Sequence, residues 1–189
     1  MKEIIKTNKQ PLISGWSVGT DPDNIGKDSG YPLSPTESAR PAEVPSAIQE
    51  RFPEYCGVAW YWCRFDCLIG GDRLILRFGV VDYMAEVWLN GSCLGSCEGG
   101  ETAFEFDVTD SIRKTEENLL AVRVINTCGK DIDGMTITNT PNRNKRLVLQ
   151  SGYTINYGGI LGDVTLCARK AVAVSDIFVT GDPETGNVT

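Results

Sequence analysis

Histidine is absent from this sequence of 189 residues, and that absence excludes several kinds of chemistry. Catalysis by Ser-His-Asp or Cys-His groups needs an imidazole, and so does every metal site with a histidine ligand. A basic excess is also missing, because 18 Lys and Arg residues stand against 25 Asp and Glu residues and give a net charge of −7. Nucleic acids and anionic membranes attract basic surfaces, so we expect neither as a partner.

Long apolar runs are missing as well. No stretch approaches the ~20 apolar residues that cross a bilayer, and the first sixteen residues lack the apolar core of a secretory signal. The seven cysteines are odd in number, so they cannot all pair within one chain. We therefore expect a cytoplasmic protein with free thiols.

Two repeated cysteine spacings suggest zinc but do not support it. Cys63 and Cys67 are four residues apart, as are Cys93 and Cys97. On a strand, such residues lie about 13 Å apart, at ~3.3 Å per residue, which is too far for two ligands of one ion. We expect no metal and no cofactor.

Alternation of apolar and polar residues dominates the chain from Tyr55 onward. Such a period of two marks antiparallel strands with one buried face. Asn90-Gly91 is a hairpin signal, and no segment keeps a helical period, although Asp110–Lys114 and Pro45–Glu50 could each form one helical turn. The predicted fold is all-β, an antiparallel β-sandwich. The alternating segments are Ala59–Leu68, Arg73–Phe78, Ala85–Leu89, Phe104–Val108 and Leu120–Val124. The predicted core residues are Leu74, Leu76, Phe78, Val87, Leu89, Phe104, Phe106, Val122, Val124 and Val164.

Two long stretches interrupt this pattern. Residues 1–50 are rich in Gly and Pro, and we expect an irregular arm strapped over the core. Residues 127–158 form one long polar insertion, and a connection of that length in a compact domain is usually functional. Two further strands are predicted after it, Asp163–Ala168 and Val172–Thr180.

Three tryptophans lie on the polar faces of predicted strands: Trp60, Trp62 and Trp88. Either a second layer covers that face, or the rings form a patch for sugar stacking or docking. The strand carboxylates Glu86, Glu105 and Asp107 also point outward, where a solvated face is expected. No pair of them forms the evident acid and base of a glycosidase.

Seven segments, taken in order, resemble the N-terminal sugar-binding domain of glycoside hydrolase family 2, the β-galactosidase and β-glucuronidase family. Their order and spacing, more than any single piece, carry the resemblance. The segments are Trp16 to Gly26, Ala42–Ser46, Gly57–Phe65, Leu76–Gly95, Glu98–Thr109, Asn118–Val124 and Asn156–Leu166.

The resemblance implies a jelly-roll β-sandwich of the galactose-binding-domain-like type over residues 1–170, with the arm 1–50 as its first part. Residues 171–189 would be the linker to, and the truncated start of, an immunoglobulin-like domain. A barrel holding the catalytic carboxylates would follow. This chain would then be a non-catalytic domain that buttresses the barrel of a β-glycosidase, inactive alone. Its expected partners are the downstream domains, carbohydrate and a second copy in a homo-oligomer.

The resemblance also implies site residues in the long insertion. Relatives often carry an acidic residue six positions before the glycine of Gly159-Ile160, where a loop reaches the sugar in the barrel. This chain has Tyr153 there, so Tyr153, Asn156 and Tyr157 are the candidates for the rim of the sugar site. Two alternatives remain: a free-standing carbohydrate-binding module that uses an aromatic platform, and a domain that serves only oligomer assembly.

Overall fold

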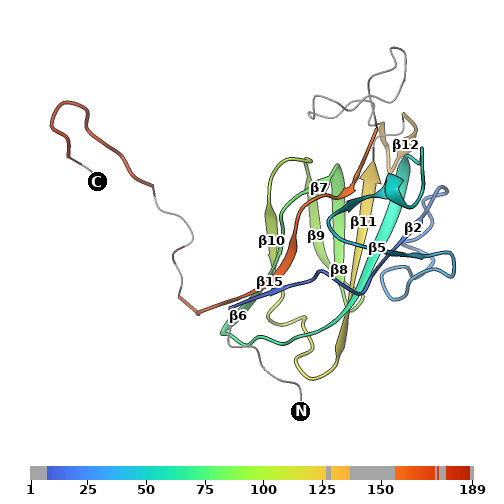
Figure 1. Cartoon of the computed structure of the whole chain (residues 1–189), viewed down its shortest axis with the longest axis horizontal. Coiled ribbons are helices and arrows are strands. Elements are labelled where there is room, and N and C mark those ends of the chain that lie inside the picture. The colour runs from blue at the N-terminus through green and yellow to red at the C-terminus, as the bar shows by residue number, and fades with distance from the viewer. Residues whose placement is uncertain (1–7, 127–128, 137–155, 173, 175–177, 188–189) are drawn as a thin grey trace.

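The protein is a sandwich of two antiparallel β-sheets, as predicted (Figure 1). The computed structural model describes residues 8–126, 129–136, 156–172, 174 and 178–187. The larger sheet has the strand order β3-β2-β5-β11-β8-β9, and the smaller has the order β1-β15-β6-β10. A short sheet, β4-β14-β7, and a hairpin, β12-β13, form separate sheets, and β7 and β14 of the short sheet contact β11 of the large one. The large sheet consists of β2 (Trp16–Thr20), β3 (Arg40–Ala42), β5 (Gly57–Asp66), β8 (Met84–Leu89), β9 (Ser92–Glu98) and β11 (Glu117–Asn126). The other strands are β1 (Lys9–Pro11), β4 (Ser46–Ala47), β6 (Arg73–Phe78), β7 (Val81–Asp82), β10 (Phe104–Asp107), β12 (Asp131–Ile132), β13 (Met135–Thr136), β14 (Gly159–Ile160) and β15 (Val164–Arg169).

The main core fills the space between the two sheets. Eight of the ten predicted core residues are buried there: Leu74, Leu76, Phe78, Val87, Leu89, Val122, Val124 and Val164. Phe104 and Phe106 are only partly buried and pack against this core, because β10 is a four-residue edge strand with nothing beyond it in its sheet. The alternating pattern identified the buried face of each strand but could not identify the sheet edges.

The outer face of the large sheet carries a second apolar cluster. β5 and β11 pair over ten residues, and nearly every residue of both strands is buried, on both faces. Trp60, Trp62 and Trp88 form the centre of this cluster, and Tyr31 from the N-terminal arm packs against it. Alternation predicted one buried face, and the arm accounts for the burial of the other.

The N-terminal arm is more regular than the sequence predicted. It contributes strands β1 to β4, and β2 pairs directly with β5 inside the large sheet. Its next turn is held by the buried carboxylate of Asp21, which accepts hydrogen bonds from the backbone N–H groups of Ile25 and Gly26 and from Nε1 of Trp60, at 2.9, 2.9 and 3.0 Å. The indole N–H of a buried tryptophan cannot bond to water and needs an acceptor within the protein. The Asp21 carboxylate is that acceptor, and it also pairs the backbone N–H groups of the turn.

Gly26 is the position at which this turn is most closely packed. A Cβ atom there would lie 2.5 Å from Nε1 of Trp60 and 2.5 Å from Cδ2 of Tyr31. We expect Gly26→Ala to lower the free energy of unfolding by about 2 kcal/mol, within the range for overpacking, when urea unfolding is followed by tryptophan fluorescence. Gly70→Ala is the control, because no heavy atom lies within 4 Å of its Cβ position, and it should change stability by less than ~0.5 kcal/mol. Equal stability of the two variants would contradict tight packing of the arm.

Local predictions had mixed outcomes. Asn90 and Gly91 both have positive φ, 54° and 83°, and join β8 to β9 as the predicted hairpin turn. Pro45–Glu50 contains a 3₁₀ turn at Ile48–Glu50, but Asp110–Lys114 is not helical, since the chain there only turns back through N–H groups bonded to the carbonyl of Val108. The predicted strand at Val172–Thr180 lies partly outside the described residues, and its described residues are not in a strand.

The findings on cysteines, metal ligands and membrane spans concern only the described part of the chain. No disulfide joins any two of the six cysteines that the structure describes, and Cys128 lies outside it. Within the same residues, no group of three or more His, Cys, Asp or Glu side chains could hold a metal ion. Among these residues, too, no helix has the length and apolar character needed to cross a membrane.

Candidate functional site

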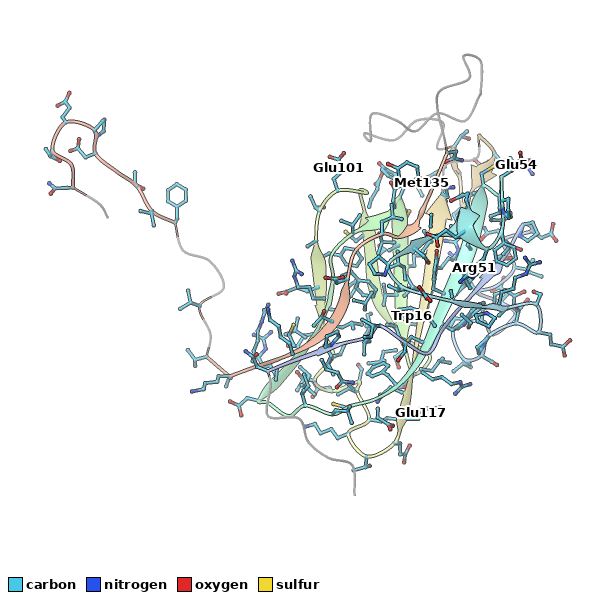
Figure 2. The ribbon with its side chains drawn as sticks, in the orientation of Figure 1. Trp16, Arg51, Glu54, Glu101, Glu117 and Met135 are labelled. Atoms are coloured by element: carbon cyan, nitrogen blue, oxygen red, sulfur yellow. The ribbon has the colours of Figure 1, made fainter. Side chains whose placement is uncertain are left out.

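The candidate site is the end of the sandwich where the chain leaves for the long insertion and returns from it. Glu54, Glu101 and Met135 lie at this end, and Glu117 lies at the opposite end (Figure 2). We call the end that carries Glu54, Glu101 and Met135 the loop end. β11 finishes there at Asn126, the β12-β13 hairpin follows, and the chain re-enters the described structure at Asn156. Of the three predicted rim residues, Asn156 and Tyr157 are half-buried at this end, and Tyr153 lies outside the described residues.

The returning strand is fixed on both sides. β14 pairs with β4 through Gly159 and Ala47, and with β7 through Gly159 and Asp82. The carbonyl of Gly158 accepts a hydrogen bond from the N–H of Ile48 at 2.7 Å, and the N–H of Gly158 donates to Oε1 of Gln49 at 3.1 Å. The backbone that follows Asn156 is therefore held by two segments of the fold, residues 46–49 on one side and β7 on the other.

Both glycines of this strand are required by close packing. A Cβ atom on Gly158 would lie 2.6 Å from Cγ of Asn126 and 2.8 Å from the carbonyl oxygen of Asp82, both fully buried residues. Gly159 has a φ of 143°, and its Cβ atom would lie 2.5 Å from the hydroxyl of Tyr61. Burial raises the pKa of Tyr61, so the phenol stays protonated and donates to the carbonyl of Ser46 at 3.3 Å. The absence of a side chain at Gly158 and Gly159 thus lets the backbone pack directly against the buried polar groups of Asn126, Asp82 and Tyr61.

The hairpin on the outgoing side is held by ion pairs. Asp133, with a φ of 53°, accepts hydrogen bonds from Asn24 at 2.7 Å and from Lys27 at 3.1 Å. Its carboxylate also lies 2.9 Å from the guanidinium of Arg123, which is fully buried. Partial burial raises the pKa of Asp133, but the hydrogen bonds from Asn24 and Lys27 and the charge of Arg123 together lower it. The carboxylate is therefore ionised at neutral pH.

A groove of about 380 Å³ lies beside this hairpin. Its walls come from the arm, from the turn before β5 and from the hairpin. Their polar side chains include Asp23, Glu54, Lys130 and Asp131. Carboxylates and ammonium groups of this kind can accept from and donate to sugar hydroxyls. The groove at the loop end therefore carries the hydrogen-bonding and charged groups that a polar ligand requires.

The candidate tryptophan patch is not at the surface. Trp60, Trp62 and Trp88 are 0%, 1% and 8% exposed, and their rings pack on one another, with centroids 6.3 Å apart for Trp60 and Trp62 and 5.1 Å apart for Trp60 and Trp88. Tyr31 closes the cluster edge-on, and its carbonyl accepts a hydrogen bond from Nε1 of Trp62 at 2.7 Å. These rings are covered by the arm and are not available for stacking on a sugar.

The strand carboxylates are all engaged by arginines. Arg169 donates one hydrogen bond to each carboxylate oxygen of Glu105, at 2.8 and 2.7 Å. Arg73 donates two hydrogen bonds to the same oxygen of Asp107, Oδ2, at 2.9 and 2.7 Å. Hydrogen bonds from Thr109 and from Arg73 lower the pKa of Asp107 to about 2. Glu86 differs from the expectation of a solvated face, since its side chain is only 20% exposed and forms an ion pair with buried Arg123.

Sequence reasoning missed the polar groups beneath the loop end. Asp82, Asn126 and Arg123 are fully buried, and Gln49 bridges Tyr55, six residues along the chain, and Gly158, 109 residues along the chain. The one available signal was Arg123, a cation in the middle of the otherwise apolar run Leu119–Ile125. A charge at such a position indicates a buried partner, since unpaired charges are not tolerated in an interior.

Comparison with known families agrees with this geometry. The model of the family described as "Glycosyl hydrolases family 2, sugar binding domain" matches residues 15–170. The matched range begins just before β2 and includes the returning strand β14 and the last strand of the smaller sheet, β15.

Curated relatives are glycosidases several times longer than this chain. A β-glucuronidase of Paenibacillus borealis is 26% identical over 199 aligned positions, covering 96% of this chain and 32% of that protein. A β-galactosidase of Thermoanaerobacter pseudethanolicus is 30% identical over 135 positions, covering 68% of this chain and 16% of that protein. The chain thus spans about a third or less of the length of these relatives.

This chain also matches about a third of each of two longer chains of known structure. A β-glucuronidase from an uncultured Clostridium species shares the fold, with a TM-score of 0.70 and 23% identity, over 97% of this chain and 33% of that one. A β-glucuronidase from Ruminococcus gnavus, solved in complex with D-glucuronic acid, has a TM-score of 0.65 and 25% identity, over 89% of this chain and 31% of that one.

Proposed function

The chain belongs to glycosyl hydrolase family 2, as a sugar-binding domain, and from this premise we propose that it is the non-catalytic N-terminal domain of a larger β-glycosidase of the β-glucuronidase or β-galactosidase type. The match over residues 15–170 and the chain's coverage of about a third of the first curated relative support this proposal. We call that larger protein the complete enzyme. In it, this domain buttresses the catalytic barrel and lends a loop to the sugar site.

The exposed apolar residues after β15 support a following domain. We propose that residues 1–170 form the sugar-binding sandwich and that residues 171–189 lead into an immunoglobulin-like domain. Val172, Val174, Phe178 and Val179 are 63–90% exposed, and residues 178–187 lie apart from the sandwich (Figure 1). Large apolar side chains that are exposed within one short stretch of sequence are of the kind that another part of a protein covers.

The anchoring of Asn156–Ile160 is the observation that carries the proposed role of the loop. The strand β14 is bound on both edges, and the backbone just before it is clamped by Ile48 and Gln49. A residue that projects from such a fixed base can hold a sugar contact without a large loss of entropy. We propose that Tyr153, Asn156 and Tyr157 form the rim of the barrel's sugar site.

Two alanine variants of the complete enzyme test this role. Tyr153→Ala and Asn156→Ala should each lower kcat/KM about tenfold, which corresponds to ~1.4 kcal/mol of lost transition-state binding, while leaving the melting temperature nearly unchanged. Glu117→Gln is the control, because Glu117 lies at the opposite end of the sandwich (Figure 2) and should leave kcat/KM unchanged. If both loop variants keep the wild-type kcat/KM, the loop is a structural connection only.

The alternative of a free-standing carbohydrate-binding module has less support. It depends on an exposed aromatic platform, and the three tryptophans that suggested one are buried. The assembly alternative has no particular observation in its favour among the described residues.

A further inference from the structure

Gln49 connects two segments of the loop end that no strand pairing joins. It lies in the 3₁₀ turn Ile48–Glu50, directly after β4, and its side chain is half-buried. Its Nε2 donates to the carbonyl of Tyr55 at 2.6 Å, and its Oε1 accepts from the N–H of Gly158 at 3.1 Å. One amide therefore bridges the turn before β5 and the backbone next to Asn156.

The two bonds fix the orientation of the amide. A backbone carbonyl can only accept and a backbone N–H can only donate, so only a group with both functions on adjacent atoms can bridge them. The N–H of Ile48 binds the carbonyl of the same residue, Gly158, at 2.7 Å. The peptide groups on either side of Gly158 are thus held by neighbouring residues of one short turn.

The turn itself is well placed to act as a rigid support. Glu50 accepts a hydrogen bond from the N–H of Ala47 at 3.1 Å, and the N–H of Phe52 donates to the carbonyl of Ile48 at 2.9 Å. At the far side, the hydroxyl of Tyr55 donates to the carbonyl of Val58 at 2.6 Å, which ties the turn to β5. The support under Gly158 is therefore continuous with the large sheet.

We propose that Gln49 is a positioning residue for the sugar site of the complete enzyme, acting through the backbone of Gly158 to set the direction in which Asn156 projects. This inference rests on the proposed function, because it assigns Asn156 to the rim of that site. A small displacement of a binding group weakens transition-state contacts strongly, since catalytic groups must be held to within ~0.5 Å. Gln49 itself touches no substrate.

Two substitutions separate the bonds of this amide. Gln49→Leu removes both, and we expect kcat and kcat/KM of the complete enzyme to fall together by about fivefold, with little change in melting temperature. Gln49→Glu keeps the acceptor for Gly158 but places a carboxylate oxygen against the carbonyl of Tyr55. Once protonated, that acid regains a donor, so the activity of Gln49→Glu relative to the wild type should rise as the pH falls from ~7 to ~5.

A double-mutant cycle with Asn156→Ala distinguishes this inference from the proposed function. If Gln49 acts through Asn156, then Gln49→Leu should cause no further loss in the Asn156→Ala background. A normal kcat/KM for both Asn156→Ala and Tyr153→Ala would overturn the loop's proposed part in the sugar site, whereas a normal value for Asn156→Ala alone would overturn only the positioning role. An impaired Asn156→Ala together with a normal Gln49→Leu, or with losses that simply multiply, would overturn the positioning role and leave the proposed function standing.

Discussion

Incubated with aryl β-glycosides, this chain on its own should release no aryl alcohol above the spontaneous rate, whereas the complete enzyme should exceed that rate by ~10⁶-fold or more. Glycoside hydrolysis needs two carboxyl groups about 5–5.5 Å or 6.5–9.5 Å apart, one of them with a raised pKa that lets it act as the acid. The strand carboxylates have the opposite environment. Hydrogen bonds from Thr109 and then from Arg73 lower the pKa of Asp107 to about 2, and Arg169 binds both oxygens of Glu105.

The measurement uses a panel of chromogenic β-glycosides that includes a β-glucuronide and a β-galactoside. The chain is purified alone and, in parallel, as a version extended through its downstream domains. The extended protein is the control for the quality of the assay and of the substrates. Turnover by the short chain that survives repurification, and that disappears in Glu105→Gln or Asp107→Asn, would show that the chain has its own catalytic pair.

The layers of the fold were predictable because their signal is local. In β6, Leu74, Leu76 and Phe78 alternate with polar or outward residues, and this pattern alone gives the strand and its buried face. β9 was not predicted, because its sequence, Ser-Cys-Leu-Gly-Ser-Cys-Glu, has small residues and no apolar alternation. It is a strand because β8 pairs with it through the Asn90-Gly91 turn.

The second layer over the tryptophans depends on contacts between distant residues. Asp21 and Trp60 are 39 residues apart, and Tyr31 and Trp62 are 31 apart. No property of the arm's own sequence specifies which strand it covers. For this reason, alternation could state that the outer face was either covered or open but could not decide between the two.

The same limit applies to the loop end. The long polar insertion indicated a functional loop. The groups that bind this backbone, Gln49 and Asp82, are more than 70 residues away in the sequence. A single glutamine in a short turn gives no sign of the bond that its amide makes across the fold.

Replacing Glu86 by glutamine should lower the free energy of unfolding by about 3 kcal/mol, the largest stability effect we expect from a single side chain. Arg123 is fully buried on β11, and Glu86 from β8 and Asp133 from the hairpin are its carboxylate partners. Removing one partner of a buried ion pair leaves an uncompensated charge and costs about 3–5 kcal/mol. We expect the lower end of that range, because Asp133 remains beside the guanidinium.

An exposed ion pair provides the matched control. Glu105→Gln likewise removes a carboxylate charge, here from the pair of Glu105 with Arg169, whose side chains are 41% and 35% exposed, respectively. We expect this substitution to change the free energy of unfolding by less than ~1 kcal/mol. Both variants are compared with the wild type by urea unfolding at pH 7. Arg123→Met in the Glu86→Gln background should restore part of the loss, because it removes the buried charge that has lost its partner.

Acid unfolding gives an independent measure of the same network. The folded-state pKa of Asp133 is lowered, so its contribution to stability is complete above its unfolded value of ~3.9 and is lost as the pH falls through the lower folded value. In Glu86→Gln, Asp133 is the one carboxylate left beside Arg123 in the described structure, and the variant starts from lower stability. Its acid midpoint should therefore lie at a higher pH than that of the wild type. Equal midpoints, together with equal urea stability at pH 7, would mean that Arg123 does not depend on Glu86 and that water compensates its charge.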